Sequence, residues 1–90
     1  MDDDNTKELI DYPCNFPIKV MGRNDPGFQQ LAVQLVQQHA GRIDADAVRA
    51  VPSRNGNFTS LTITIVATSR EQLDNIYQSL TDHEDVLMAL

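Results

Sequence analysis

The sequence predicts an α+β sandwich in which two helices cover one face of an antiparallel sheet, with the elements in the order βαββαβ. Two stretches place apolar residues at the 3.6-residue spacing of a helix that is apolar on one side. Other stretches alternate apolar and polar residues, as half-buried strands do. A chain of 90 residues, 41% of them hydrophobic and 22% charged, suffices for one compact domain and is too short for two.

The first strand is expected over residues 16–21, where the apolar residues of one face alternate with Pro17, Lys19 and Met21 on the other. Pro17 has no N–H group, so we expect it near the start of the strand or on an unpaired side. Asp25 then suits the N-cap of a helix, and Pro26 suits its first position. The helix carries one apolar stripe and ends before Gly41. The stripe is formed by Phe28, Leu31, Ala32, Leu35 and Val36.

A second strand over residues 45–51 has shallow alternation and ends at Pro52. Asn55-Gly56 predicts a tight hairpin turn, because both residue types tolerate positive φ. The third strand, over 58–67, alternates clearly. Its two faces carry Leu61, Ile63, Ile65 and Ala67 on one side and Ser60, Thr62, Thr64 and Val66 on the other.

Ser69 and Gln72 form a capping box that predicts the start of the second helix. A short apolar strand over residues 86–90 completes the chain. Two helices with one apolar stripe each suit a sheet covered on a single face, which is the ferredoxin-like arrangement with the first and third strands in the middle. A less regular α+β layout is the alternative if the second strand fails to form.

Residues 1–11 are expected to be a polar N-terminal arm, and residues 12–90 the single domain. The chain has one cysteine, no apolar stretch of signal-peptide length after Met1 and no run of membrane-spanning length. These features predict a cytoplasmic protein without membrane contact. The net charge is −6 and the seven basic residues are scattered, which argues against a nucleic-acid partner.

The sheet face turned away from the helices is a candidate interface. Lys19, Met21, Thr62 and Thr64 are expected to lie on it. The alternative is a solvated sheet face whose threonines reflect β propensity alone. RNA-binding domains of this topology place aromatic residues at these central positions, and here those positions hold Lys, Met and Thr, so RNA binding is disfavoured.

The junction between the first strand and the first helix is a candidate ligand site. Gly22, Asn24, Asp25 and Gly27 form a glycine-bearing turn that enters a helix N-terminus, where free N–H groups favour an anion such as a carboxylate. A capped turn that binds no ligand is an equally weighted interpretation, because Pro26 removes one donor and Asp25 supplies an acceptor of its own.

Two resemblances add to these patterns. Residues 19–28, Lys-Val-Met-Gly-Arg-Asn-Asp-Pro-Gly-Phe, resemble the opening of ACT domains, which regulate metabolic enzymes by binding amino acids. Asn24 stands where those domains commonly have Asp. Residues 9–22 and 52–64 are similar to the start and central hairpin of the YbeD-like proteins, small bacterial proteins of unknown function. This second resemblance implies an ACT-like ferredoxin fold and carries over no catalytic residue.

The sequence holds no phosphate-binding loop, dinucleotide fingerprint or serine elbow, and we expect no cofactor, no metal site and no catalytic residue. The leading prediction is an ACT-like regulatory or adaptor module that associates with itself or with another protein. Sensing of a small metabolite, such as an amino acid, is a further option within that prediction. The alternatives are a small enzyme that uses Cys14 or a carboxylate and, less favoured, RNA binding through the sheet face.

Overall fold

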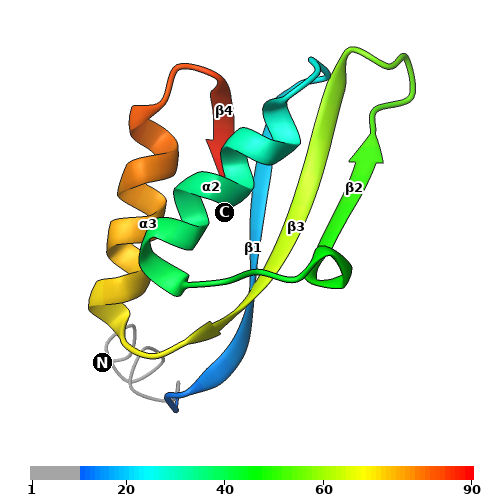
Figure 1. Ribbon diagram of the computed structural model, residues 1–90. Coiled ribbons are helices and arrows are strands. Elements are labelled where there is room, and N and C mark those ends of the chain that lie inside the picture. The colour runs from blue at the N-terminus through cyan, green and yellow to red at the C-terminus, as the bar shows by residue number, and fades with distance from the viewer. Residues whose placement is uncertain (1–10) are drawn as a thin grey trace, which may run out of the picture.

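In the computed structural model, which describes residues 11–90, an antiparallel sheet of four strands carries two helices on one face (Figure 1). The strand order is β2-β3-β1-β4, so the predicted ferredoxin-like arrangement with β1 and β3 in the middle is confirmed. The elements are β1 (Cys14–Arg23), α2 (Phe28–Ala40), the 3-10 turn η1 (Ala45–Ala47), β2 (Val48–Pro52), β3 (Phe58–Ala67), α3 (Arg70–Asp82) and β4 (Val86–Ala89).

The sequence predicts a polar arm and one domain, and the structure describes only the domain and the last residue of the arm. The predicted domain over 12–90 falls within it, whereas the predicted polar arm over 1–11 lies outside it except for Asp11. Within residues 11–90, neither helix combines the length and the apolar run that crossing a bilayer needs.

The long central strands β1 and β3 form the base of the core. They pair over ten residues each, from Cys14 opposite Ala67 to Arg23 opposite Phe58, so β1 is longer than the predicted strand. Lys19 exchanges both backbone hydrogen bonds with Leu90, at 2.9 and 2.7 Å, so alternate residues of β1 direct their polar groups toward β4. By the same alternation, the backbone nitrogen of Pro17 points toward the β4 edge of the strand. It lies beyond the end of β4, so it is unpaired there, as the missing N–H group predicts.

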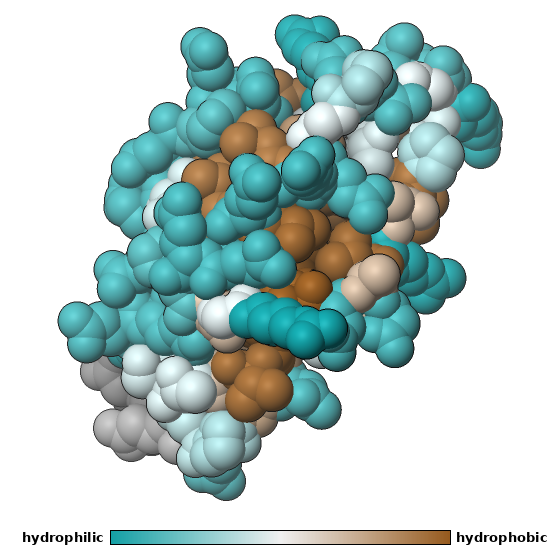
Figure 2. Space-filling view, in the orientation of Figure 1, coloured by the Kyte–Doolittle hydropathy of each residue, from teal (hydrophilic) through white to brown (hydrophobic). Residues whose placement is uncertain are grey.

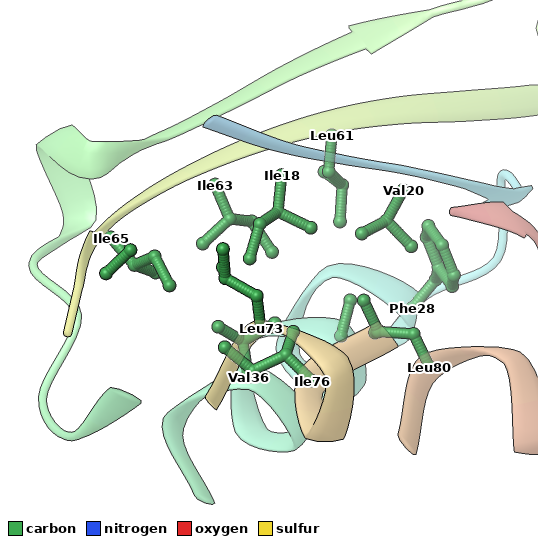
Figure 3. Packing of buried hydrophobic residues seen from close by; sticks show 12 residues of the cluster. Ile18, Val20, Phe28, Val36, Leu61, Ile63, Ile65, Leu73, Ile76 and Leu80 are labelled. Carbon is green, nitrogen blue, oxygen red and sulfur yellow. The ribbon is translucent and has the colours of Figure 1, made fainter. Parts of the chain in front are cut away.

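The core lies between the sheet and the two helices (Figure 3). The alternation of β1 and β3 points one set of side chains toward the helices, and the apolar stripe of each helix meets this set. Both predicted stripes are confirmed, although Leu31 and Leu35 are only half-buried. The buried core consists of Ile18, Val20, Phe28, Ala32, Val36, Leu61, Ile63, Ile65, Ala67, Leu73, Ile76 and Leu80.

Polar contacts at the helix ends hold the helical layer in place. Ser69 accepts a hydrogen bond from the N–H of Gln72 at 3.0 Å, which confirms the predicted cap of α3. The side-chain amide of Gln72 connects two segments. Its oxygen accepts a hydrogen bond from the N–H of Thr68, before α3, and its nitrogen donates to the carbonyl of His39 on α2. Nε2 of His39 lies 2.8 Å from Oγ of Ser79 and thereby joins α2 to α3.

The predicted start of the second strand is wrong, whereas the hairpin that follows it forms. Residues 45–47 form a 3-10 turn closed by the N–H of Ala47 on the carbonyl of Asp44, and the strand begins only at Val48. The predicted hairpin at Asn55-Gly56 forms, and the N–H of Ser53 closes it on the carbonyl of Phe58. Only Gly56 of the predicted pair has positive φ, at 79°.

The edge strand β2 stands outside the area that the helices cover (Figure 1). Ala50 and Pro52 occupy the helix-facing side of the sheet, opposite Leu61 and Thr59, yet both are exposed. Figure 2 shows hydrophobic side chains in the gap between α2 and the strands β2 and β3, whereas the outer surfaces of α2 and α3 are hydrophilic. The shallow alternation of β2 is explained by this exposure on both faces.

Candidate functional site

The junction between β1 and α2 begins with a close packing contact. Gly22 is buried in β1, at a bulge in the pairing with β4. A Cβ atom at Gly22 would lie 2.2 Å from Cε1 of Phe28 and 2.8 Å from the carbonyl oxygen of Asp85. Phe28 closes this end of the core beside Val20 (Figure 3). Gly22 is therefore required so that the Phe28 ring can pack directly on the strand backbone.

The start of α2 differs from the predicted cap. The helix begins at Phe28, its N-cap is Gly27 with φ 90°, and no side chain caps it. Asp25 instead shapes the preceding turn through its backbone, because its carbonyl accepts a hydrogen bond from the N–H of Phe28 at 3.2 Å. The predictions of Asp25 as N-cap and Pro26 as first helical residue are wrong, since the turn at Pro26-Gly27 delays the helix by two residues.

Asn24 ties the junction to the β2–β3 hairpin. Its Oδ1 accepts a hydrogen bond from Oγ1 of Thr59 at 2.8 Å, and its Nδ2 donates to the carbonyl of Gly56 at 3.0 Å. Its backbone N–H donates to the carbonyl of Asn57 at 2.9 Å. Thr59 is only 9% exposed on the core side of β3, so this bond satisfies a buried hydroxyl group. The Asn24 side chain is thus engaged within the fold.

Two hollows lie beside the junction. One, of about 190 Å³, runs between the turn and the segment before β4. Its lining includes the cation Arg23 and three acidic residues, so the surroundings are not those of a simple anion site. The other, of about 390 Å³, lies between the start of α2 and the exposed strand β2. The acidic residues of the first hollow are Asp25, Glu84 and Asp85.

The structure places three of the four predicted ligand residues beside the hollows. Asp25 and Gly27 line both hollows, and Asn24 lines the larger one while its side chain is bonded to the hairpin. Gly22 lies under the Phe28 ring. Ligand binding at the junction stays a prediction, and the residues that it would use are Asp25 and Gly27 with Arg23, which sequence reasoning did not single out.

The open face of the sheet brings together the four predicted interface residues. The pairing register places Lys19 opposite Thr62, Met21 opposite Ser60 and Pro17 opposite Thr64. Because the helices cover the other face, these side chains point away from the core. Lys19, Met21 and Thr64 are exposed and Thr62 is half-buried. Their role as an interface stays a prediction.

The same face holds residues that sequence reasoning missed. Arg49 lies opposite Thr62 and Val51 opposite Ser60, while β4 places Met88 opposite Met21. Leu90, which bonds to Lys19, is 67% exposed. The signals that could have revealed them are the Arg49–Val51 alternation and the apolar edge strand, whose outward residues have no second layer to cover them.

A shallow dent of about 70 Å³ lies on this face between β1 and β4. Its lining is mainly apolar side chain with one cation and one hydroxyl group. The residues that line it are Lys19, Val20, Met21, Ser60, Met88 and Leu90. A partner can insert one side chain into this dent.

The cysteine and the histidines each make contacts within the fold. Cys14 is half-buried at the start of β1 and packs against the core. His39 is bonded to Ser79 on the helical layer, and His83 accepts a hydrogen bond from the N–H of Asp85. Among residues 11–90, no group of three or more His, Cys, Asp or Glu side chains has the geometry of a metal site.

The chain is similar along most of its length to small bacterial proteins. A family model described as a protein of unknown function, DUF493, matches residues 7–90. A UPF0250 protein of Paraburkholderia phymatum is 49% identical over 84 residues, which cover 93% of this chain and 94% of the relative. A UPF0250 protein of Nitrosomonas europaea is also 49% identical, with coverage of 93% and 97%. The resemblance to the YbeD-like proteins is thereby confirmed.

One solved structure shares the fold. The solution structure of the protein HP0495 from H. pylori superposes with a TM-score of 0.75, covers 100% of this chain and 94% of its own, and is 19% identical. At that identity the likeness supports the fold alone.

Proposed function

This chain belongs to the DUF493 family of proteins of unknown function, and we propose that it is a small cytoplasmic association module that binds a protein partner through the open face of its sheet. In this role the helical layer stabilises the sheet, and the open face provides the contact. A regulatory or adaptor effect follows from what the partner does when the module is bound.

The observation that carries this proposal is where the exposed apolar residues gather. Among residues 11–90, five of the six large hydrophobic residues that are exposed lie on the open face, and four of them lie near one another at the end of the face that holds Met21. Such a group of exposed apolar residues is typical of surfaces that bind another macromolecule. The five residues and their exposed fractions are Met21 (38%), Val51 (52%), Val66 (55%), Met88 (50%) and Leu90 (67%).

A site-specific photocrosslinker tests this proposal in living cells. Met88→p-benzoylphenylalanine places the probe on the open face, and Gln34→p-benzoylphenylalanine places it on an exposed position of α2 as the matched control. We expect discrete crosslinked protein bands from position 88 and none from position 34. Equal crosslinking from both positions, or from position 34 alone, would count against the open face as the contact surface.

Sensing of a small metabolite is supported by the charges around the 190 Å³ hollow. Arg23 and three carboxylates line it together with the apolar side chains of Phe28 and Leu87. Charges of both signs beside an apolar wall suit a zwitterion such as an amino acid better than a simple anion. A thermal-shift screen of amino acids at millimolar concentration tests this, because a ligand of the native state raises the melting temperature. The rise should shrink in Glu84→Gln, and a flat screen would remove amino acids as ligands.

The rival function, a small enzyme that uses Cys14 or a carboxylate, has less support. Cys14 packs against the core, and the two histidines of the chain are bonded elsewhere. A nucleophilic thiol needs an adjacent base and access to substrate. Fast reaction of Cys14 with a thiol reagent at neutral pH would revive this rival.

A further inference from the structure

We propose that the open face selects an acidic protein segment, in which carboxylates flank an apolar side chain. This inference rests on the proposed function and specifies the chemistry of the partner. It follows from the sign and the position of the charges on the sheet, from the apolar row beside them and from the dent between β1 and β4.

Among residues 11–90, the sheet carries basic residues but no acidic ones. The four strands carry three charged residues, Lys19, Arg23 and Arg49, and all are basic. The pairing register and the alternation of the strands place Lys19 and Arg49 on the open face. Arg23, at the end of β1, instead lines the 190 Å³ hollow beside three carboxylates. The nine acidic residues among 11–90 all lie in the helices and connections. The open face is therefore locally positive although the net charge of the chain is −6, and it attracts negatively charged groups.

Two of these cations form one row across the sheet. Arg49 on β2 and Lys19 on β1 both pair with Thr62 on the strand between them. Two strand spacings separate their backbones by on the order of 10 Å. Neither residue forms an ion pair with another described residue. The row therefore presents two separated positive charges with a threonine hydroxyl between them.

The next row along the sheet is apolar except for Ser60. Val51, Ser60, Met21 and Met88 follow one another across the four strands. The 70 Å³ dent lies where this row meets Lys19 and Leu90. A segment that lies across the face can thus place one apolar side chain in the dent and carboxylates over the cations.

A second copy of the chain is a poor occupant of this face. A two-fold contact between open faces would bring the basic residues of both copies together. The strands offer no carboxylate to compensate them, so the pairing would leave like charges opposed.

Nucleic acid is also disfavoured. Base stacking needs aromatic side chains on the central strands, and among the residues that the structure describes the open face has only the half-buried Phe58 at its end. The exposed apolar residues are aliphatic. The net charge of −6 further repels a long polyanion, whereas a short acidic segment meets mainly the local field.

A random-peptide display library tests the inference even though the partner is unidentified. The full chain is immobilised and the library is panned at low salt. We expect enrichment of peptides that combine two or more Asp or Glu residues with a Leu, Ile, Met or Phe. Fluorescence anisotropy of the enriched peptides should give a Kd that weakens on the order of tenfold in Lys19→Glu/Arg49→Glu. It should weaken also as salt is raised to about 0.5 M.

A matched control separates the local charge from the overall charge. Arg42→Glu/Arg70→Glu makes the same change in net charge, at two exposed residues outside the sheet. This control should bind the enriched peptides like the original chain. Equal weakening in both double variants would overturn the inference, because the effect would then be one of overall charge.

The remaining outcomes distinguish the two proposals. Enriched peptides that are neutral or basic, and that lose binding in Met21→Asp, would overturn the acidic preference and leave the association surface intact. Enriched peptides that bind Met21→Asp and Met88→Asp as well as the original chain would overturn the proposed function itself. Tighter binding of a single-stranded RNA oligomer than of any enriched peptide, or a stable dimer lost in Met88→Asp, would also overturn the inference.

Discussion

The strand–helix junction and the open sheet face differ in how the fold uses their residues. In the junction, Gly22 lies under a ring, Asn24 makes two side-chain hydrogen bonds and Gly27 adopts positive φ. On the open face, Lys19 and Met21 are exposed. The junction is the part of the sequence with a recognisable pattern, yet much of that pattern serves folding. The open face has no motif, and its side chains remain available for contact.

In a small domain of this kind, residues that the fold does not use are the better candidates for function. A glycine or an asparagine that is needed for a close approach or a buried hydrogen bond cannot also be free for a ligand. Strand residues that point away from the core contribute little to stability, so their chemistry can be set by a partner. Three single variants and one double variant test this division, ordered from the largest expected effect on unfolding to the smallest.

Gly22→Ala should destabilise the fold most, by about 3 kcal/mol, because the new methyl group overlaps the Phe28 ring and a backbone carbonyl. Urea denaturation measures the change in the free energy of unfolding. The cost should fall in a Phe28→Leu background, where the ring is absent. Equal costs in both backgrounds would show that the ring does not impose glycine here.

Asn24→Ala should cost about 2 kcal/mol, because it leaves the buried hydroxyl group of Thr59 without its acceptor and frees the hairpin. Thr59→Val removes the same bond from the other side while keeping the shape of the side chain. The double variant should therefore cost less than the sum of the two single variants. Strict additivity in denaturation would contradict the coupling between junction and hairpin.

Gly27→Ala should cost about 1 kcal/mol, which is smaller than at Gly22 because only the backbone conformation resists the substitution. The residue has φ 90°, and an added Cβ atom would meet nothing within 4 Å. Gly27→Asn should be milder, since asparagine tolerates positive φ better than alanine. A loss at Gly27 as large as at Gly22 would mean that packing as well as backbone conformation constrains the turn.

Lys19→Glu/Arg49→Glu should change the free energy of unfolding by less than about 0.5 kcal/mol, because neither side chain is buried or paired with another described residue. The same variant should lose binding to acidic peptides. A large loss of stability would show that the fold needs these side chains, as it needs those of the junction, and would contradict the difference between the two regions.

Most of the fold could be predicted because its local signals agree with one another. The alternation of residues 58–67, the stripe that starts at Phe28 and the Ser69 cap each indicate the element that forms. The start of β2 was predicted three residues too early, because residues 45–47 form a 3-10 turn and the strand, exposed on both faces, has only shallow alternation. The cap of α2 was missed because the chain turns once more at Gly27, where a residue with positive φ replaces the side-chain cap.

The candidate site was harder to predict than the fold. Placing Lys19 and Thr62 on one face needs only the period of a strand, and the register confirms that placement. Adding Arg49 and Met88 needs the order of the strands and the pairing across them, which are long-range features. Asn24 was predicted as a ligand residue, but its side chain is bonded within the fold. Its partners lie on a hairpin more than thirty residues away in the sequence, so the local pattern could not reveal them.

The bonds of Asn24 have a consequence for how the molecule opens. They connect the start of α2 to the tip of the β2–β3 hairpin, so neither segment can detach without breaking hydrogen bonds held by the other. Segments joined in this way open as one cooperative unit. The amide hydrogens of Asn24 and of the hairpin strands should therefore exchange with solvent deuterium at matching rates, although far apart in sequence. Hydrogen exchange would then report the two segments as a single unit of local unfolding.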